Sequence, residues 1–121
     1  MKKLSLIMAL LLSSANFSFA QTPVTTQPKS VVSYNNSSTI TVTNTFQSIW
    51  IANVNRVACT VQNNGTHNMW VFFGPIANAT ENNSVVLQAG QFVSCNSGNI
   101  ILQDQVSITG TASDAFFAAQ Q

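Results

Sequence analysis

The chain alternates apolar and polar residues in short runs that turn residues interrupt, and this pattern restricts it to one fold class. Period two is typical of strands with one buried face, and no segment has the 3.6-residue period of a helix. The pattern predicts an all-β fold, a single antiparallel β-sandwich of about seven to nine short strands, jelly-roll or immunoglobulin-like. The runs cover residues 39–43, 46–54, 56–62, 69–73, 85–88, 91–95, 100–103, 106–109 and 115–119.

The N-terminus has the three parts of a bacterial-type secretory signal peptide. Met1-Lys2-Lys3 is basic, an apolar stretch runs from Leu4 to Leu12, and Ser18-Phe19-Ala20 is a small-x-small site before Gln21. We therefore expect cleavage after residue 20 and export to the periplasm, the cell surface or the medium. No later apolar run approaches the ~20 residues that a spanning helix needs, so we expect no integral membrane segment in the mature chain.

The mature chain divides into an arm and one domain. Residues 21–37 are polar, contain Pro23 and Pro28 and lack periodicity, which predicts an extended N-terminal arm. The arm is either a flexible leader or a segment that donates a strand or tethers the protein to a surface. Residues 38–121 have room for one core and are expected to form the β-sandwich domain.

Charge is scarce after residue 20. Lys29 and Arg56 stand against three acidic residues, which gives a formal net charge of −1 for the mature chain; the acidic residues are Glu81, Asp104 and Asp114. A basic surface for nucleic acid is therefore not expected. Low charge also weakens repulsion between copies, which favours a homo-oligomer or a lasting surface partner.

The two cysteines are expected to form a structural disulfide, because the protein is predicted to be exported. Cys59 shares a strand face with Val57 and Val61, and Cys95 shares one with Val93. Both thiols should therefore point into the core. A redox-active pair is disfavoured because the sequence has no Cys-x-x-Cys spacing.

A turn between two of the runs predicts a hairpin. Asn63-Asn64-Gly65-Thr66 separates run 56–62 from run 69–73, and Asn-Gly readily takes the positive φ angles of a tight turn. We expect these two runs to pair antiparallel.

The segment Met69-Trp70-Val71-Phe72-Phe73 is apolar on both faces. Either it is a central strand covered on both sides, or Trp70 and Phe72 form an exposed face that binds another subunit. A second binding hypothesis is a carbohydrate-binding module, in which Trp50 or Trp70 stacks on a sugar ring and Asn side chains bind its hydroxyls. Plain core packing is the simpler interpretation of each aromatic residue.

Catalytic patterns are missing from the sequence. His67 is the single histidine and is expected to be an exposed turn residue, so no metal site or cofactor is predicted. No Ser-His-acid grouping or Gly-x-Ser-x-Gly motif occurs. A secreted hydrolase with a carboxylate pair is the least favoured hypothesis, and its candidates are Glu81, Asp104 and Asp114.

Four stretches resemble small β-sandwich domains of tailed-phage and prophage proteins. The stretches are Asn55–Thr66, Trp70–Gly74, Leu87–Gln91 and Asp104–Thr111, within residues 39–119. The resemblance implies a surface or virion-type β-sandwich without catalytic residues. Together with export and low charge, it leads to one hypothesis. The protein is a non-enzymatic, exported structural or interaction protein that assembles or binds at the cell surface or in the periplasm.

Overall fold

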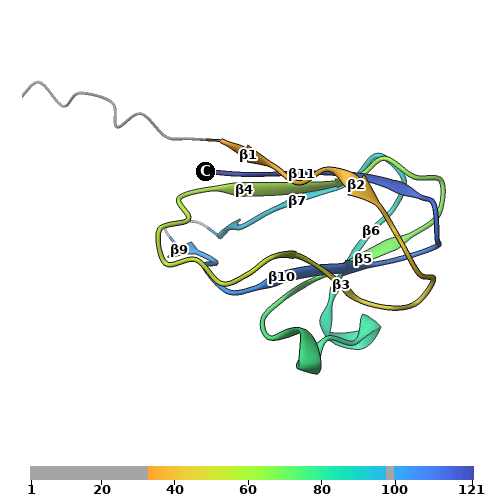
Figure 1. The fold of residues 1–121 in the computed structure, drawn as a ribbon, viewed down its shortest axis with the longest axis horizontal. Coiled ribbons are helices and arrows are strands. Elements are labelled where there is room, and N and C mark those ends of the chain that lie inside the picture. The colour runs from red at the N-terminus through yellow and green to blue at the C-terminus, as the bar shows by residue number, and fades with distance from the viewer. Residues whose placement is uncertain (1–32, 98–99) are drawn as a thin grey trace, which may run out of the picture.

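The computed structural model describes residues 33–97 and 100–121 (Figure 1). The expected signal peptide and most of the expected arm lie outside the described residues. The strands are β1 (Tyr34–Asn35), β2 (Ser38–Thr39), β3 (Gln47–Trp50), β4 (Cys59–Asn63), β5 (Met69–Phe73), β6 (Val85–Leu87), β7 (Phe92–Ser94), β8 (Asn96–Ser97), β9 (Ile100–Ile101), β10 (Val106–Thr109) and β11 (Ala115–Gln120). Two single-turn 3₁₀ helices, η1 (Ile76–Asn78) and η2 (Glu81–Asn83), follow β5.

The strands form two antiparallel sheets that face each other. Sheet A has the order β1-β11-β4-β7, with β2 also paired to β11, and sheet B has the order β3-β10-β5-β6. Strands β8 and β9 form a separate hairpin. Figure 1 shows the two sheets as layers, with the 3₁₀ helices on the far side of sheet B. The prediction of an all-β antiparallel sandwich is confirmed.

The core lies between the sheets and consists of the residues that the alternation places inward. Val61 of β4, Val71 of β5 and Ile108 of β10 are completely buried. The other buried apolar residues are Ile40, Ile49, Trp50, Cys59, Met69, Leu87, Cys95, Val106, Phe116 and Ala118. Burial of these side chains is the main favourable term for such a fold.

The expected disulfide is present and joins neighbouring strands of sheet A. Cys59 begins β4, Cys95 follows β7, and their Cα atoms are 5.1 Å apart. Both residues are buried, which confirms that the thiols point into the core. Val57, expected on the same face as Cys59, lies before β4 and is partly exposed.

The predicted hairpin between runs 56–62 and 69–73 is wrong. Strand β4 pairs with β11 and β7, whereas β5 pairs with β10 and β6 in the other sheet. The buried side chain of Asn63 explains the difference, because its Nδ2 donates to the carbonyls of His67 (2.7 Å) and Leu87 (2.8 Å). Its Oδ1 also accepts the N–H of Gly65 at 2.9 Å. These bonds shape the turn into a crossing between sheets, and Gly65 does not take a positive φ.

Several runs form shorter strands than predicted. In run 39–43 the strand ends at Thr39, and Ile40 is buried while Val42 is exposed. Run 46–54 ends as a strand at Trp50, because the following loop is held by other bonds, including the Asn53 N–H to the carbonyl of Gln103. By contrast, a strand forms where none was predicted: Tyr34–Asn35, within the expected arm, is β1 and pairs with β11.

A buried arginine organises the loops at one end of the sandwich. Arg56 is 1% exposed, and its guanidinium donates to the carbonyls of Ile51 (3.0 Å), Leu102 (3.2 Å) and Asp104 (2.7 Å). Its Nε donates to Oε1 of Gln120 at 2.8 Å. Burial lowers the pKa of Arg56, and the negative charge of Asp104 opposes that shift. A guanidinium stays protonated in such a site, so it can cross-link its own loop (residues 51–58), the loop of residues 102–105 and the last strand.

Candidate functional site

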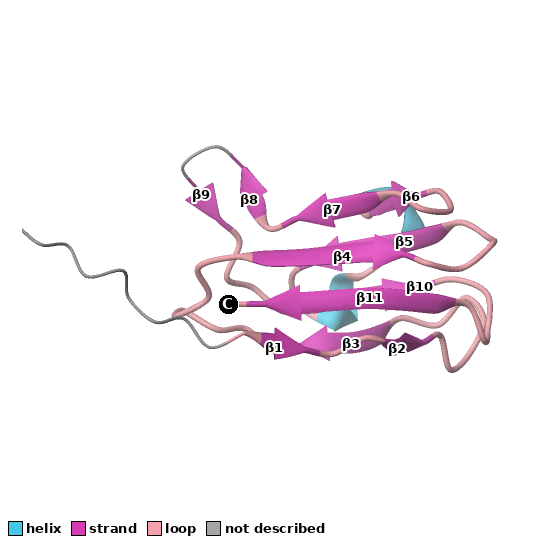
Figure 2. Ribbon diagram, turned by 90° about the horizontal axis from the view of Figure 1, so that it is seen from above, coloured by secondary structure: helices cyan, strands magenta, loops and turns pink. Residues whose placement is uncertain are grey.

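One side of the sandwich is closed by side-chain hydrogen bonds. Here the edge strand β3 of sheet B lies near β1 and β2 of sheet A (Figure 2). The Nδ2 of Asn36 donates to the carbonyl of Ile49 in β3 at 2.7 Å. Gln47 of β3 accepts the N–H of Thr41 at 2.8 Å and donates to the carbonyl of Thr39 at 3.1 Å. These bonds bridge the two sheets, so this side offers little room for an added strand.

The opposite side, between β6 and β7, is open. These two strands are the other edges of sheets B and A, and the turn of residues 88–91 joins them (Figure 2). An apolar groove of about 500 Å³ lies there. Its lining residues are Val85, Val86, Leu87, Gly90, Gln91, Phe92 and Val93. We call the exposed part of this surface, formed by Val85, Val86, Gln91, Phe92 and Val93, the open edge.

The open edge exposes large apolar side chains. Phe92 is 66% exposed, Val86 49% and Val85 43%. Val85 lies opposite the fully buried Val71 in the ladder between β6 and β5, so it belongs to the inward-facing row. Its exposure shows that the core is not covered at this edge by the described residues. Exposed apolar surface of this kind marks interaction sites.

The backbone of β7 also has hydrogen-bonding groups that are unpaired within residues 33–97 and 100–121. Among the described strands, β4 alone pairs with β7. The bonds of this ladder run through the odd-numbered residues of β7, since the N–H of Cys95 donates to the carbonyl of Cys59 and the N–H of Asn63 donates to the carbonyl of Gln91. In an antiparallel ladder the alternate residues direct their N–H and C=O groups the other way. The backbone groups of Phe92 and Ser94 therefore point away from the sheet, toward the open side.

The open edge carries no ionisable side chain, as its lining residues show. Native proteins protect edge strands with lysine, proline, bulges or covering segments. Strands β6 and β7 have neither lysine nor proline. Within the described residues, the short length of β6 and β7 is the one feature that limits pairing with another strand. The arrangement suits the addition of a strand or of an apolar surface, rather than acid-base chemistry.

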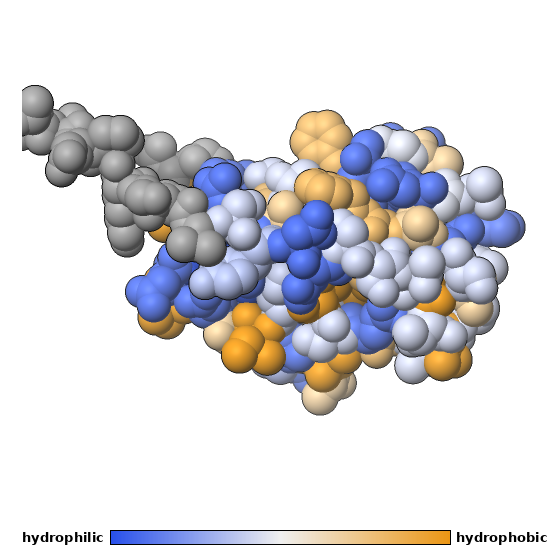
Figure 3. All heavy atoms as spheres, turned by 45° about the horizontal axis from the view of Figure 1, so that its top comes forward, coloured by the Kyte–Doolittle hydropathy of each residue, from blue (hydrophilic) through white to orange (hydrophobic). Residues whose placement is uncertain are grey.

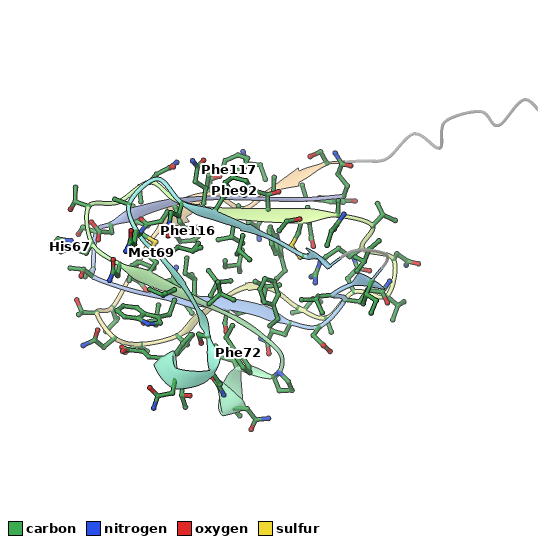
Figure 4. The ribbon with its side chains drawn as sticks, turned by 180° about the vertical axis from the view of Figure 1, so that it is seen from behind. His67, Met69, Phe72, Phe92, Phe116 and Phe117 are labelled. Atoms are coloured by element: carbon green, nitrogen blue, oxygen red, sulfur yellow. A yellow bond between two sulfur atoms is a disulfide. The ribbon has the colours of Figure 1, made fainter. Side chains whose placement is uncertain are left out.

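Trp70 and Phe72 lie on the outer face of sheet B and are half-buried. They stand opposite Thr109 and Ser107 of β10, whose side chains are buried at 1% and 0% exposure. Phe72 extends toward the 3₁₀ helices in Figure 4, while Phe92 and Phe117 extend from the opposite, outer face of sheet A. Strand β5 is thus an interior strand whose outer face is partly covered. This result is intermediate between the two predicted alternatives, a strand covered on both faces and a strand with an exposed Trp70 and Phe72 face.

Trp50 is buried rather than open to a ligand. It is 4% exposed, and the guanidinium of Arg56 lies 5.6 Å from the centroid of its ring. This geometry is a cation–π contact within the fold. The carbohydrate hypothesis gains no support from Trp50, because a sugar needs an open ring face.

Asp104 and Asp114 do not form the close pair that a hydrolase needs. Asp104 and Asp114 flank opposite ends of β10, and a strand of this length spans roughly 14 Å, beyond the about 9.5 Å limit for glycosidase carboxylates. Asp114 accepts bonds from the N–H groups of Thr66 (3.3 Å) and His67 (3.2 Å). Its Oδ2 lies 2.9 Å from Nδ1 of His67, which is exposed as expected. Asp114 thus has a structural role in the crossing loop.

Sequence reasoning missed Phe92, Val85 and Val86. A signal for Phe92 was present, because the inward phase of Val93 and Cys95 places Phe92 outward. The exposure of Val85 could not be inferred, since it depends on β6 and β7 both being sheet edges. In Figure 3, which tilts the outer face of sheet A toward the viewer, apolar side chains occur as separate patches among polar ones. This outer face is therefore not one continuous apolar surface.

Metal-binding and membrane-spanning features are both missing from the described residues. Residues 33–97 and 100–121 contain no group of three or more histidine, cysteine, aspartate or glutamate side chains suited to a metal ion. The same residues include no helix of sufficient length and apolarity to span a bilayer.

Comparison with known proteins gives a distant structural likeness. No family description matches the sequence, and no curated protein matches it. A similar solved structure comes from Bacillus endospore appendages, which are described as a novel family of disulfide-linked pili. It has 19% sequence identity and a TM-score of 0.44, over 74% of this chain and 83% of that chain. Similarity at this level defines neither a family nor a function. The phage-type resemblance stays a prediction beyond the small β domain itself.

Proposed function

We propose that this chain is a non-enzymatic, exported structural or interaction protein that binds a partner through the open edge, at the cell surface or in the periplasm. The observation that carries the proposal is the unpaired backbone of Phe92 and Ser94 beside an apolar groove. An extended segment can add to such an edge through backbone hydrogen bonds, and the groove can then accept its side chains.

Two features support the exported setting. Residues 1–20 have the pattern of a cleaved signal peptide. The buried bridge between Cys59 and Cys95 is typical of proteins that fold in an oxidising compartment. The domain boundaries follow from the same proposal: signal peptide 1–20, arm 21–37 and sandwich 38–121, with the end of the arm contributing β1.

The experiment combines fractionation with site-specific crosslinking. The full chain, with a C-terminal tag, is produced in a Gram-negative host that incorporates photo-reactive benzoylphenylalanine at position 92. Phe92 is a suitable site because its side chain is 66% exposed. The matched control carries the same group at Val54, which is 78% exposed in the loop after β3.

We expect a processed, exported protein that forms adducts of defined mass from position 92 and few from position 54. Retention of an uncleaved chain in the cytoplasm would refute the exported role. Equal adduct yields from the two positions, or none from position 92, would refute binding through the open edge.

A further inference from the structure

We infer that the partner of the open edge is a second copy of this chain, with β7 of each copy running antiparallel so that the two A sheets become one. This inference rests on the proposed function and names its partner. It is carried by three observations: the direction of the unpaired backbone groups, the absence of charge at the open edge, and the closure of the opposite side.

The backbone of β7 is self-complementary around Val93. In a contact with twofold symmetry, Phe92 of one copy lies opposite Ser94 of the other, and Val93 lies opposite its own counterpart. The N–H and C=O groups of Phe92 and Ser94 all point outward, so this register forms about four hydrogen bonds between the copies. It leaves Val93 at the symmetry axis, on the side of the strand that faces the core.

The charge distribution favours a second copy over a charged partner. In an isologous contact, both copies present the same side chains around the axis, so a charge near the axis would lie close to a like charge. The open edge contains none. An acidic or basic partner would gain nothing at this surface, whereas an identical apolar edge is not repelled.

Apolar complementarity extends to the second sheet. Strand β6 lies beside β7 at the same side of the sandwich, so joining two A sheets also brings the two β6 edges toward each other. The exposed side chains of Val85 and Val86 of one copy would then cover those of the other copy across the groove. The closed side cannot do this, because Asn36 and Gln47 already occupy backbone groups of Ile49, Thr39 and Thr41.

The test measures the self-association of the purified mature chain, residues 21–121. Sedimentation and native mass spectrometry give the mass from about 1 to about 500 µM, a range that covers moderate affinities. Amide exchange by NMR then follows Phe92 and Ser94 as the concentration rises. The edge variant is Phe92→Lys, with Ser94→Lys as a second variant, and the matched control is Val54→Lys at a more exposed apolar position outside the edge.

We expect a dimer whose formation protects the amides of Phe92 and Ser94. Phe92→Lys should raise the dissociation constant by about tenfold or more, because each copy then places a lysine beside the axis, diagonal to the lysine of the other copy on the same face, whereas Val54→Lys should leave it unchanged. Circular dichroism and an intact disulfide confirm that each variant is folded; if Phe92→Lys is not, Ser94→Lys decides.

A monomer at every concentration would overturn the inference. So would a dimer that tolerates both edge variants, including a dimer that is lost only when residues 21–32 are removed, since the arm would then be the contact. Crosslinks from position 92 to another protein, with a monomeric purified chain, would overturn the inference while the proposed function stands.

Discussion

Cys95 donates its backbone N–H to the carbonyl of Cys59 over 3.1 Å and shares a disulfide with the same residue. The two bonds hold the end of β7 against β4. Because β7 is an edge strand with β4 as its sheet neighbour, the disulfide fixes the strand that forms half of the open edge. Its role is therefore both to stabilise the fold and to keep the unpaired backbone of β7 in place.

Replacing both cysteines, in the variant Cys59→Ser/Cys95→Ser, should lower the free energy of unfolding by about 4 kcal/mol. The bridge closes a loop between residues separated by 36 positions, and in the chain-entropy model such a loop restricts the unfolded chain by that amount. Urea titration at pH 7 gives the value. Wild-type protein unfolded with a reductant is the control and should match the variant. A loss below about 1 kcal/mol would contradict this role.

Removing the guanidinium of Arg56 should strongly destabilise the protein. Arg56→Met leaves the carbonyls of Ile51, Leu102 and Asp104 without this donor, and the expected loss is about 2 to 4 kcal/mol. Arg56→Lys keeps the charge but cannot reproduce the fork, so it should lose most of the same stability. Thermal and urea unfolding measure both variants. If Arg56→Lys is as stable as wild type, charge rather than geometry holds the loops.

The sequence predicted the sheet class, the disulfide and the inward rows, because each follows from local alternation or from the export that the N-terminal pattern predicts. Val61, Val71 and Ile108 are buried as their phase requires. Strand pairing was not predictable at the Asn-Gly turn. The φ preference of Asn64-Gly65 favours a hairpin, but the buried amide of Asn63 forms three bonds that direct the chain to the other sheet. The tertiary hydrogen bonds of Asn63 therefore outweigh the local hairpin preference of Asn64-Gly65.

The candidate site was less predictable than the fold. The size of Trp70 and Phe72 and their doubly apolar strand favour a binding role, yet β5 is an interior strand and both rings are half-buried. Exposure at an edge depends on strand order, which alternation does not encode. Arg56 illustrates the same limit, because its buried guanidinium is bound by carbonyls of two loops that lie far apart in the sequence.

Gly65 should not tolerate a side chain. A Cβ at this position would lie 2.6 Å from Cβ of Asp114, which is closer than real atoms approach. We expect Gly65→Ala to cost about 1 to 3 kcal/mol of unfolding free energy, the usual range for overpacking. The same substitution in an Asp114→Gly background should cost clearly less, since glycine removes both Cβ and Cγ, which would each lie 2.6 Å from the added atom. Urea unfolding of the four proteins forms a double-mutant cycle. Strictly additive losses would show that the contact with Asp114 is not the cause.

The carboxylate of Asp114 should make stability depend on pH in the acid range. Its burial raises the pKa, but hydrogen bonds from His67 and Thr66 lower it by more, so the pKa lies below the ordinary 3.8. Because the folded-state pKa is lower than the unfolded one, the stabilisation is fully present above pH 3.8. It is lost as the pH falls through the folded-state pKa. Asp114→Asn should therefore be less stable than wild type at pH 7, and the two should converge as the pH falls through the folded-state pKa.

Urea unfolding at intervals from pH 7 to pH 2 measures this convergence. His67→Ala serves as the intermediate variant, because it removes the 2.9 Å contact from Nδ1 but keeps the backbone N–H groups of Thr66 and His67. Its pH-dependent loss should be smaller than that of Asp114→Asn. A difference between wild type and Asp114→Asn that stays constant over the whole range would mean that the bonds stabilise the crossing loop without favouring the charged carboxylate.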